Sequence, residues 1–233
     1  MLNHMKNSNY RNRMDSGVHI LNYPEKPLVN TKMSEYIFNS KLPCGKNLIV
    51  AVASYGGYNQ EDAVIINRSS LEKGCFITTY YKTYESYEKF DKKTQVNEIF
   101  YSPENDDRNV PLHKEYDYSK LEDSGLIKEN VLVDDKTILI GKTSETLLGS
   151  DYYSDESVAP KKGQLGYVDK SFMCETENGK RLSKVRIRHD RIPMIGDKFC
   201  SRAGQKGTIG VVLEEKDMPF NEHGQRPDII VNP

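Results

Sequence analysis

The chain has 233 residues, of which 36% are hydrophobic and 29% are charged, with 33 Lys and Arg against 34 Asp and Glu. That length can bury the core of one or two domains, and a formal net charge of -1 favours no class of partner. The four cysteines form no Cys-x-x-Cys pair for a zinc site or a disulfide framework, and no run of about 18 apolar residues could span a membrane, so we expect a soluble, intracellular protein.

The N-terminal region predicts little regular structure. Residues 1–12 are polar, and we expect them to form a disordered arm, with order beginning near Arg13. Pro24 and Pro27 disfavour a helix, so the segment around them should be extended. A short helical stretch is expected over residues 32–39.

Two apolar runs follow. Residues 47–53, apolar apart from Asn47, form a run bounded by glycines, the pattern of a strand buried on both faces. Residues 63–66 form a second such run. Residues 69–74 then indicate a capped helical turn that ends at Gly74.

From about Thr79 to Arg181 tyrosines and alternating charges dominate, which indicates an insertion or a second domain. Short strands are expected within it at 131–133, 137–141 and 163–168, and after it at 184–188, 208–213 and 228–231. The first strand after the insertion alternates polar with apolar residues and should be half-buried. The predicted fold class is mainly β with few helices.

A glycine-punctuated run, residues 196–207, presents three cationic side chains, Lys198, Arg202 and Lys206. Glycine permits positive φ and a close approach of backbone N–H groups to a ligand, while Lys and Arg donate to phosphate oxygens. From Arg186 to the end of this run Lys and Arg clearly outnumber Asp, and such a local excess usually faces an anion. The run predicts a phosphorylated ligand. A solvated β-hairpin with a basic tip is the alternative.

Two adjacent carboxylates, Glu61 and Asp62, lie between the two apolar runs. Adjacent strand residues point to opposite faces, so only one of the pair should address a given site. Carboxylate oxygens suit Mg²⁺, which takes few protein ligands and fills its shell with water and phosphates. A solvated turn is the alternative for this pair. A nucleotide-kinase phosphate loop is disfavoured, because Gln205 separates Gly204 from Lys206.

Three segments together resemble the second-largest, beta-type subunit of multisubunit DNA-dependent RNA polymerases. They are GYNQEDAVIINRSSLEKG at 57–74, GDKFCSRAGQKGTIG at 196–210, and MPF with RPDIIVNP at the end. The resemblance extends in order over nearly the whole chain, more weakly through the middle. Gln60 and Gln205 resemble the form of eukaryotes, archaea and large DNA viruses more than the bacterial form.

The resemblance implies a hybrid-binding domain built on a double-psi β-barrel and interrupted by an inserted wall, or flap, domain. The first part of the hybrid-binding domain would be residues 13–78 and the second part 186–233, with the wall at 79–185. It also implies an intracellular location, in the nucleus or in a viral factory or virion.

The RNA- and nucleotide-binding residues that the resemblance implies are Lys198, Arg202, Gln205 and Lys206. Lys198 and Lys206 are the implied catalytic residues, expected to contact the RNA 3′ end and the phosphates of the incoming nucleotide. The implied reaction is nucleotidyl transfer, in which the RNA 3′-hydroxyl attacks the α-phosphate of a nucleoside triphosphate.

The implied cofactor is Mg²⁺, in a two-metal site. Glu61 and Asp62 are expected to approach the second, nucleotide-borne ion, directly or through water, whereas the first ion is held by the largest subunit. The implied partners are the largest and other polymerase subunits, template DNA, the RNA–DNA hybrid and nucleoside triphosphates, with no membrane. By itself the chain should be catalytically inert.

The chain departs from the family pattern in two ways. Ala203 stands where the family usually has histidine, so that imidazole is missing. The family subunit is also several times longer, which leaves a fragment, a split-gene product or a partial reading of a longer protein. The alternatives to a catalytic-core piece are a non-catalytic nucleic-acid-binding β-barrel module and an inactive fragment.

Overall fold

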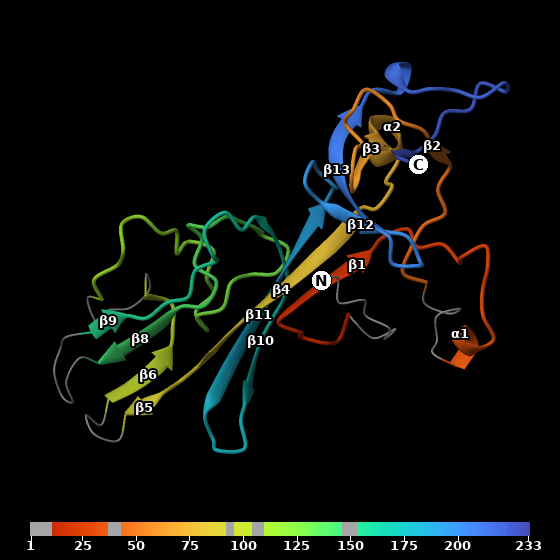
Figure 1. Cartoon of the computed structure of the whole chain (residues 1–233). Coiled ribbons are helices and arrows are strands. Elements are labelled where there is room, and N and C mark those ends of the chain that lie inside the picture. The colour runs from red at the N-terminus through yellow and green to blue at the C-terminus, as the bar shows by residue number, and fades with distance from the viewer. Residues whose placement is uncertain (1–10, 37–42, 92–95, 104–109, 146–152) are drawn as a thin grey trace. The chain divides into compact units, whose positions relative to one another are not determined.

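A computed structural model of the chain describes residues 11–36, 43–91, 96–103, 110–145 and 153–233. Most of the predicted N-terminal arm lies outside these described residues. The described part of the chain (Figure 1) forms two units. Each unit has its own cluster of buried apolar side chains. The first unit comprises residues 19–79 and 190–233, and the second unit comprises residues 11–18 and 80–189.

The prediction of a mainly β protein is confirmed. Strands β2, β3, β12, β13 and β14 of the first unit span Val50–Val52, Ala63–Asn67, Lys198–Cys200, Lys206–Leu213 and Ile229–Val231. This unit also holds α1 (Met33–Tyr36), α2 (Arg68–Glu72) and the 3-10 helix η2 (Glu215–Asp217). Strands β1, β4 and β11, at Gly17–Leu21, Thr78–Tyr87 and Arg181–Arg191, begin in one unit and end in the other. Within the second unit lie β5 (Phe90–Asp91), β6 (Val96–Phe100), β7 (Leu132–Val133), β8 (Lys142–Glu145), β9 (Tyr153–Asp155) and β10 (Gly166–Glu175).

The five strands of the first unit form one mixed sheet in the order β12-β13-β3-β14-β2. Strand β13 runs parallel to β3, β3 antiparallel to β14, and β14 parallel to β2. Alternate residues of β3 enter two apolar clusters, since Val64 and Ile66 pack with Ile209, whereas Ile65 packs with Ile230. The sheet is therefore buried on both faces at its centre. Among the described residues its strand pairings do not close into a barrel.

The prediction that residues 47–53 form a strand buried on both faces is wrong. Strand β2 covers only Val50–Val52 and pairs with β14 alone, at the edge of the sheet. Ile49, Val50 and Val52 are about half exposed, at 54%, 48% and 65%. An apolar run indicates a strand that can be buried on both faces. Whether both faces are in fact covered depends on the position of the strand in the sheet, and an edge strand has fewer neighbours to cover it.

The helical turn expected over residues 69–74 is confirmed, with its start at Arg68 and its cap at Asn67, ahead of the expected bounds. Asn67 is its N-cap, and its side-chain oxygen accepts a hydrogen bond from the Ser69 backbone N–H at 3.0 Å. The turn ends at Gly74, whose φ is 95° and whose N–H donates to the Leu71 carbonyl at 2.9 Å. Residues 37–39 of the helical stretch expected over 32–39 lie outside the described residues, and α1 covers all of the rest except Lys32.

The second unit is built around the sheet β1-β4-β11-β10-β7 and the smaller sheet β5-β6-β8-β9. Val168, Val185 and Ile187 enter its apolar cluster from β10 and β11, together with Leu139 and Ile140 from a loop. A strand was expected over residues 137–141, but the structure has isolated bridges at Thr137 and Ile140 instead. Within the described residues no helix is long and apolar enough to cross a membrane.

Candidate functional site

The two lysines that the sequence singles out lie on the same face of a β-hairpin. Strand β12 pairs antiparallel with β13, with Lys198 opposite Thr208 and Cys200 opposite Lys206. Opposed residues of an antiparallel pair share a face, and so do alternate residues along one strand. Lys198 and Lys206 are therefore diagonal neighbours, with a backbone separation of about 7–8 Å. Both are exposed.

The opposite face of this hairpin packs into the first unit. Phe199 contacts Phe76, with ring centroids 4.6 Å apart, and belongs to the apolar cluster that includes Val64. Gly207 lies opposite Phe199, and a Cβ at this glycine would lie 2.7 Å from Val64 Cγ1. Gly207 thus allows β13 to approach β3. Because Phe199 packs into this apolar cluster, the opposite face of the hairpin, which carries Lys198 and Lys206, points away from it.

The turn between β12 and β13 holds Gln205 and Ala203, both exposed. The Ser201 N–H donates to the Gln205 carbonyl at 3.0 Å, and the Gly204 N–H donates to the Ser201 carbonyl at 3.0 Å. Gly204 has a φ of 93°, a conformation that favours glycine. Backbone bonds therefore close the turn without any contribution from residue 203.

Arg202 has a structural contact that sequence reasoning missed. Its guanidinium donates to the Val29 carbonyl at 2.5 Å and to Asn30 Oδ1 at 3.0 Å. It therefore ties the hairpin turn to a segment far away in the sequence. Its role in RNA or nucleotide binding stays a prediction, and that role would compete with these bonds.

The carboxylate pair Glu61 and Asp62 ends a turn, residues 56–62, that leads directly into β3. The Thr208 N–H donates to the Asp62 carbonyl at 2.7 Å, so this turn adjoins the strand that carries Lys206. Both carboxylate residues are exposed, and Glu61 has a φ of 54°, which is uncommon outside glycine. The fold thus brings the backbones of the two motifs into contact.

The turn at 56–62 is fixed by the buried side chain of Asn59 and by close packing against Gly210 of β13. Asn59 is fully buried, its side-chain oxygen accepting from the Tyr55 N–H at 3.2 Å and its amide donating to the Ala53 carbonyl at 2.7 Å. Gly210 lies at a register shift between β13 and β3, and a Cβ there would come closer than 3.0 Å to the Tyr58 carbonyl oxygen. A side chain at position 210 would therefore displace the turn.

Ion pairs remove much of the local cationic excess that the sequence shows. Arg186 and Arg188 pair with Asp169 at 2.5 and 3.5 Å, and Arg191 pairs with Asp197 at 2.5 Å. In the described parts of the chain no carboxylate pairs with either hairpin lysine. Within the described part of the run, the Lys198 and Lys206 ammonium groups therefore have no protein carboxylate beside them, and neither does Arg202, which donates to neutral oxygens instead.

Glu61 and Asp62 are adjacent, exposed carboxylate residues of the turn at 56–62. Among the described residues, no three His, Cys, Asp or Glu side chains gather to hold an ion. Mg²⁺ commonly takes one or two protein carboxylates and completes its shell with substrate phosphates and water. An exposed carboxylate of this turn has the chemistry for that share.

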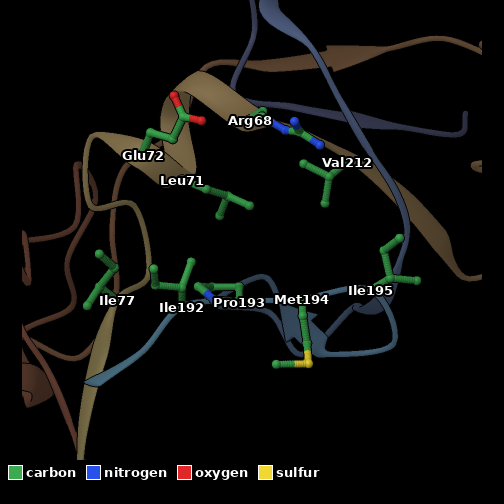
Figure 2. A pocket seen from close by; sticks show the side chains of 9 residues that line it. All are labelled: Arg68, Leu71, Glu72, Ile77, Ile192, Pro193, Met194, Ile195 and Val212. Atoms are coloured by element: carbon green, nitrogen blue, oxygen red, sulfur yellow. The ribbon is translucent and has the colours of Figure 1, made fainter. Parts of the chain in front are cut away.

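Sequence reasoning also missed an apolar pocket of about 630 Å³ in the first unit. Figure 2 shows Leu71 and Val212 on one side of it and Ile192 and Pro193 on the other, with the charged side chains of α2 at the rim. The signal was the apolar run at residues 192–195, which leads directly into the glycine-lysine segment. The pocket holds none of the residues that the sequence singled out for chemistry.

Comparison with known proteins assigns the family. The family model described as RNA polymerase Rpb2, domain 6, matches residues 2–233. The chain belongs to this family. It is 42% identical to DNA-directed RNA polymerase II subunit RPB2 of Encephalitozoon cuniculi (strain GB-M1) over 97% of its own length and 20% of that protein. The resemblance noted from the motifs is thereby confirmed.

Relatives from other organisms align over the same extent. The chain is 42% identical to DNA-directed RNA polymerase II subunit 2 of Arabidopsis thaliana, over 97% of the chain and 19% of that protein. It is 41% identical to DNA-directed RNA polymerase subunit Rpo2 of Saccharolobus solfataricus (strain ATCC 35092 / DSM 1617 / JCM 11322 / P2), over 97% of the chain and 21% of that protein. The Rpb2 domain 6 chain therefore spans about a fifth of the length of these relatives.

Proposed function

We propose that this chain forms part of the catalytic core of a DNA-directed RNA polymerase. In this role it holds the RNA 3′ end and the incoming nucleoside triphosphate during RNA synthesis. The observation that carries the proposal is the shared outward face of Lys198 and Lys206 on the β12–β13 hairpin. Membership of the Rpb2 domain 6 family supports the same reaction.

The two lysines would act through charge. In nucleotidyl transfer the RNA 3′-oxygen forms a bond to the α-phosphorus, and the bond to the β-phosphate oxygen breaks, releasing pyrophosphate. Negative charge accumulates on the phosphate oxygens of the transition state, where preorganised cations stabilise it. Lys198 and Lys206, diagonal neighbours on one hairpin, would bind these oxygens and orient the reactants. No general base is assigned to this chain.

We assign the carboxylate turn to the metal side of the same reaction. Mg²⁺, when bound, would stabilise the attacking and leaving oxygens. Asp62 would bind the nucleotide-borne ion directly or through water, and Glu61 would add negative charge beside it. The hydrogen bond from Thr208 to the Asp62 carbonyl supports this assignment, because it joins the turn to the lysine-bearing strand. The ligands of the first ion belong to the largest subunit in this proposal.

We further propose that the mixed sheet of the first unit is part of a double-psi β-barrel. Its combination of parallel pairs, β13 with β3 and β14 with β2, around an antiparallel pair supports this assignment. The first unit would then be the hybrid-binding domain, approximately residues 13–78 and 186–233. The second unit would be the inserted wall, approximately 79–185.

The proposed partners follow from this role. They are the largest and other polymerase subunits, template DNA, the RNA–DNA hybrid and nucleoside triphosphates. RNA polymerase II subunits among the relatives support an intracellular, nuclear location and give a viral factory no support.

The test is nucleotide addition by the assembled polymerase with Lys206→Ala in this chain. We expect assembly to be unchanged and the rate of single-nucleotide addition to fall by about 10²-fold, the usual cost of losing one preorganised group that stabilises transition-state charge. Lys216→Ala is the matched control, since Lys216 is an exposed lysine on η2. An unchanged rate for Lys206→Ala in fully assembled enzyme would refute the proposal.

A further inference from the structure

The second unit has an exposed sheet face on which aromatic and cationic side chains are interleaved. In the antiparallel pair of β10 and β11, Tyr167 lies opposite Arg188 and Phe172 lies opposite Lys184. Opposed residues share a face. Tyr167 and Phe172 are 48% and 38% exposed. The face is therefore a row of aromatic–cation pairs rather than an ordinary charged surface.

A bulge adds one more cation to this face. The β10–β11 register shifts between Val168, which lies opposite Ile187, and Lys170, which lies opposite Arg186. Val168 and Ile187 are fully buried in the core, so without the extra residue, Asp169, strand alternation would turn Lys170 inward as well. The bulge instead places Lys170 on the outer face, between the two aromatic pairs.

The charges of this face are only partly balanced. Asp169 pairs with Arg186 and Arg188, and Glu85 of β4 pairs with Lys184 at 3.1 Å. Two further carboxylates lie close by: Asp15, whose pKa is lowered by Arg13 and also by Arg186, and Glu129, which accepts a hydrogen bond from the Ser171 N–H of β10 at 3.1 Å. Among the described residues Lys170 has no ion pair, so its ammonium group would attract an anionic ligand.

One part of the face is occupied by the chain itself. The Arg186 guanidinium donates to the carbonyls of Arg11 and Arg13 and lies over the Tyr81 ring, 5.0 Å from its centroid. The N-terminal segment therefore crosses the face at β11. The open part lies over β10 and continues to β7, where Leu132 lies opposite Tyr167 and is 56% exposed.

We propose that this open face, defined by Tyr167, Lys170, Phe172, Lys184 and Arg188, binds single-stranded nucleic acid. Bases stack on the two aromatic rings, and the backbone phosphates contact the three cations. Sheet faces with exposed aromatic residues bind unpaired bases in this way, because every base has a π-face. A duplex hides its base faces, and an acidic peptide would use the cations but not the rings. This site is in the second unit and does not depend on the function proposed for the hairpin lysines.

The first experiment measures binding of a short fluorescein-labelled single-stranded RNA to the full chain by fluorescence anisotropy. We expect Tyr167→Ala combined with Phe172→Ala to weaken binding at least tenfold, since base stacking on one aromatic residue contributes about that factor. Phe220→Ala is the control, because Phe220 is also an exposed aromatic residue, at 72%. Thermal unfolding confirms that each variant is folded. A double variant that binds as tightly as wild type overturns the proposal.

The second experiment separates phosphate contacts from other effects. Lys170→Ala should weaken binding and reduce the slope of log affinity against log salt by about 0.7, the value for one phosphate contact on a single strand. An unchanged slope contradicts this contact. Single-stranded DNA should bind like RNA, duplex RNA should bind more weakly, and polyglutamate should compete poorly. Equal competition by polyglutamate, with no effect of the aromatic substitutions, would identify an acidic peptide site and overturn the proposal.

The hairpin lysines provide the last comparison. Lys198→Ala with Lys206→Ala should leave the binding that depends on Tyr167 and Phe172 intact. If only the lysine variants abolish binding, the sheet-face proposal fails while the hairpin proposal stands. If only the sheet-face variants do so, the sheet-face proposal is supported, and the hairpin is judged separately by nucleotide addition.

Discussion

Replacing Gly210 by alanine should damage the candidate site without touching any charged residue. Gly210 lies where the register of β13 and β3 shifts. A Cβ there would approach the Tyr58 carbonyl oxygen to less than 3.0 Å and the Ala63 Cβ to 3.4 Å. The closer neighbour is backbone, so no side-chain rotation can relieve the contact. The strands or the turn at 56–62 must move.

The expected magnitude follows from two opposing terms. Overpacking of this kind costs about 1–3 kcal/mol, whereas replacing glycine by alanine restricts the unfolded chain and returns about 0.4–1 kcal/mol. The net destabilisation should be roughly 1–2 kcal/mol, which lowers the melting temperature by about 2–8 °C for a chain of this size.

The assay is thermal and urea unfolding of Gly210→Ala beside Gly45→Ala. Gly45 has nothing within 4 Å of an added Cβ and no positive φ, so its substitution should be neutral or slightly stabilising. In the assembled polymerase Gly210→Ala should also slow nucleotide addition, because the displaced turn carries Asp62. Equal stability of the two variants would refute the packing argument.

Two further predictions concern single groups. Burial raises the pKa of the Cys75 thiol to about 11. At pH 8 an aromatic disulfide reagent should therefore label the exposed Cys44, Cys174 and Cys200 quickly and Cys75 only after unfolding. Equally fast labelling of all four thiols in the folded chain would contradict this. In the assembled enzyme Asp62→Asn should raise the Mg²⁺ concentration needed for half-maximal nucleotide addition severalfold, because an amide is a weaker ligand than a carboxylate. A Mg²⁺ titration of the variant that matches that of the wild type would count against the metal assignment.

The local patterns of the sequence predicted the centre of the first sheet well. The apolar run at 63–66 became β3, buried on both faces, and the segment around Thr208 became β13. The helical turn ends at Gly74 as expected, whereas its N-cap is Asn67, which the expected bounds of 69–74 did not include. These features depend on neighbouring residues, so sequence alone could indicate them.

Features that depend on distant residues were not predictable. The edge position of Val50 and Val52 depends on where the sheet ends, and the contact of Arg202 with Val29 joins segments far apart in the chain. The glycines of the run at residues 196–207 also have different roles from one another. Gly204 adopts a positive φ, as expected, whereas Gly207 lets β13 approach β3.

The central claim is that Lys198 and Lys206 lie against the RNA 3′ end and the nucleotide. RNA whose 3′-terminal ribose has been oxidised to a dialdehyde forms a Schiff base with a nearby lysine amine, and borohydride reduction fixes the bond for peptide mapping. In the assembled polymerase we predict labelling of Lys198 or Lys206, lost in the variant with both lysines changed to arginine. Label confined to residues outside the β12–β13 hairpin would contradict the account.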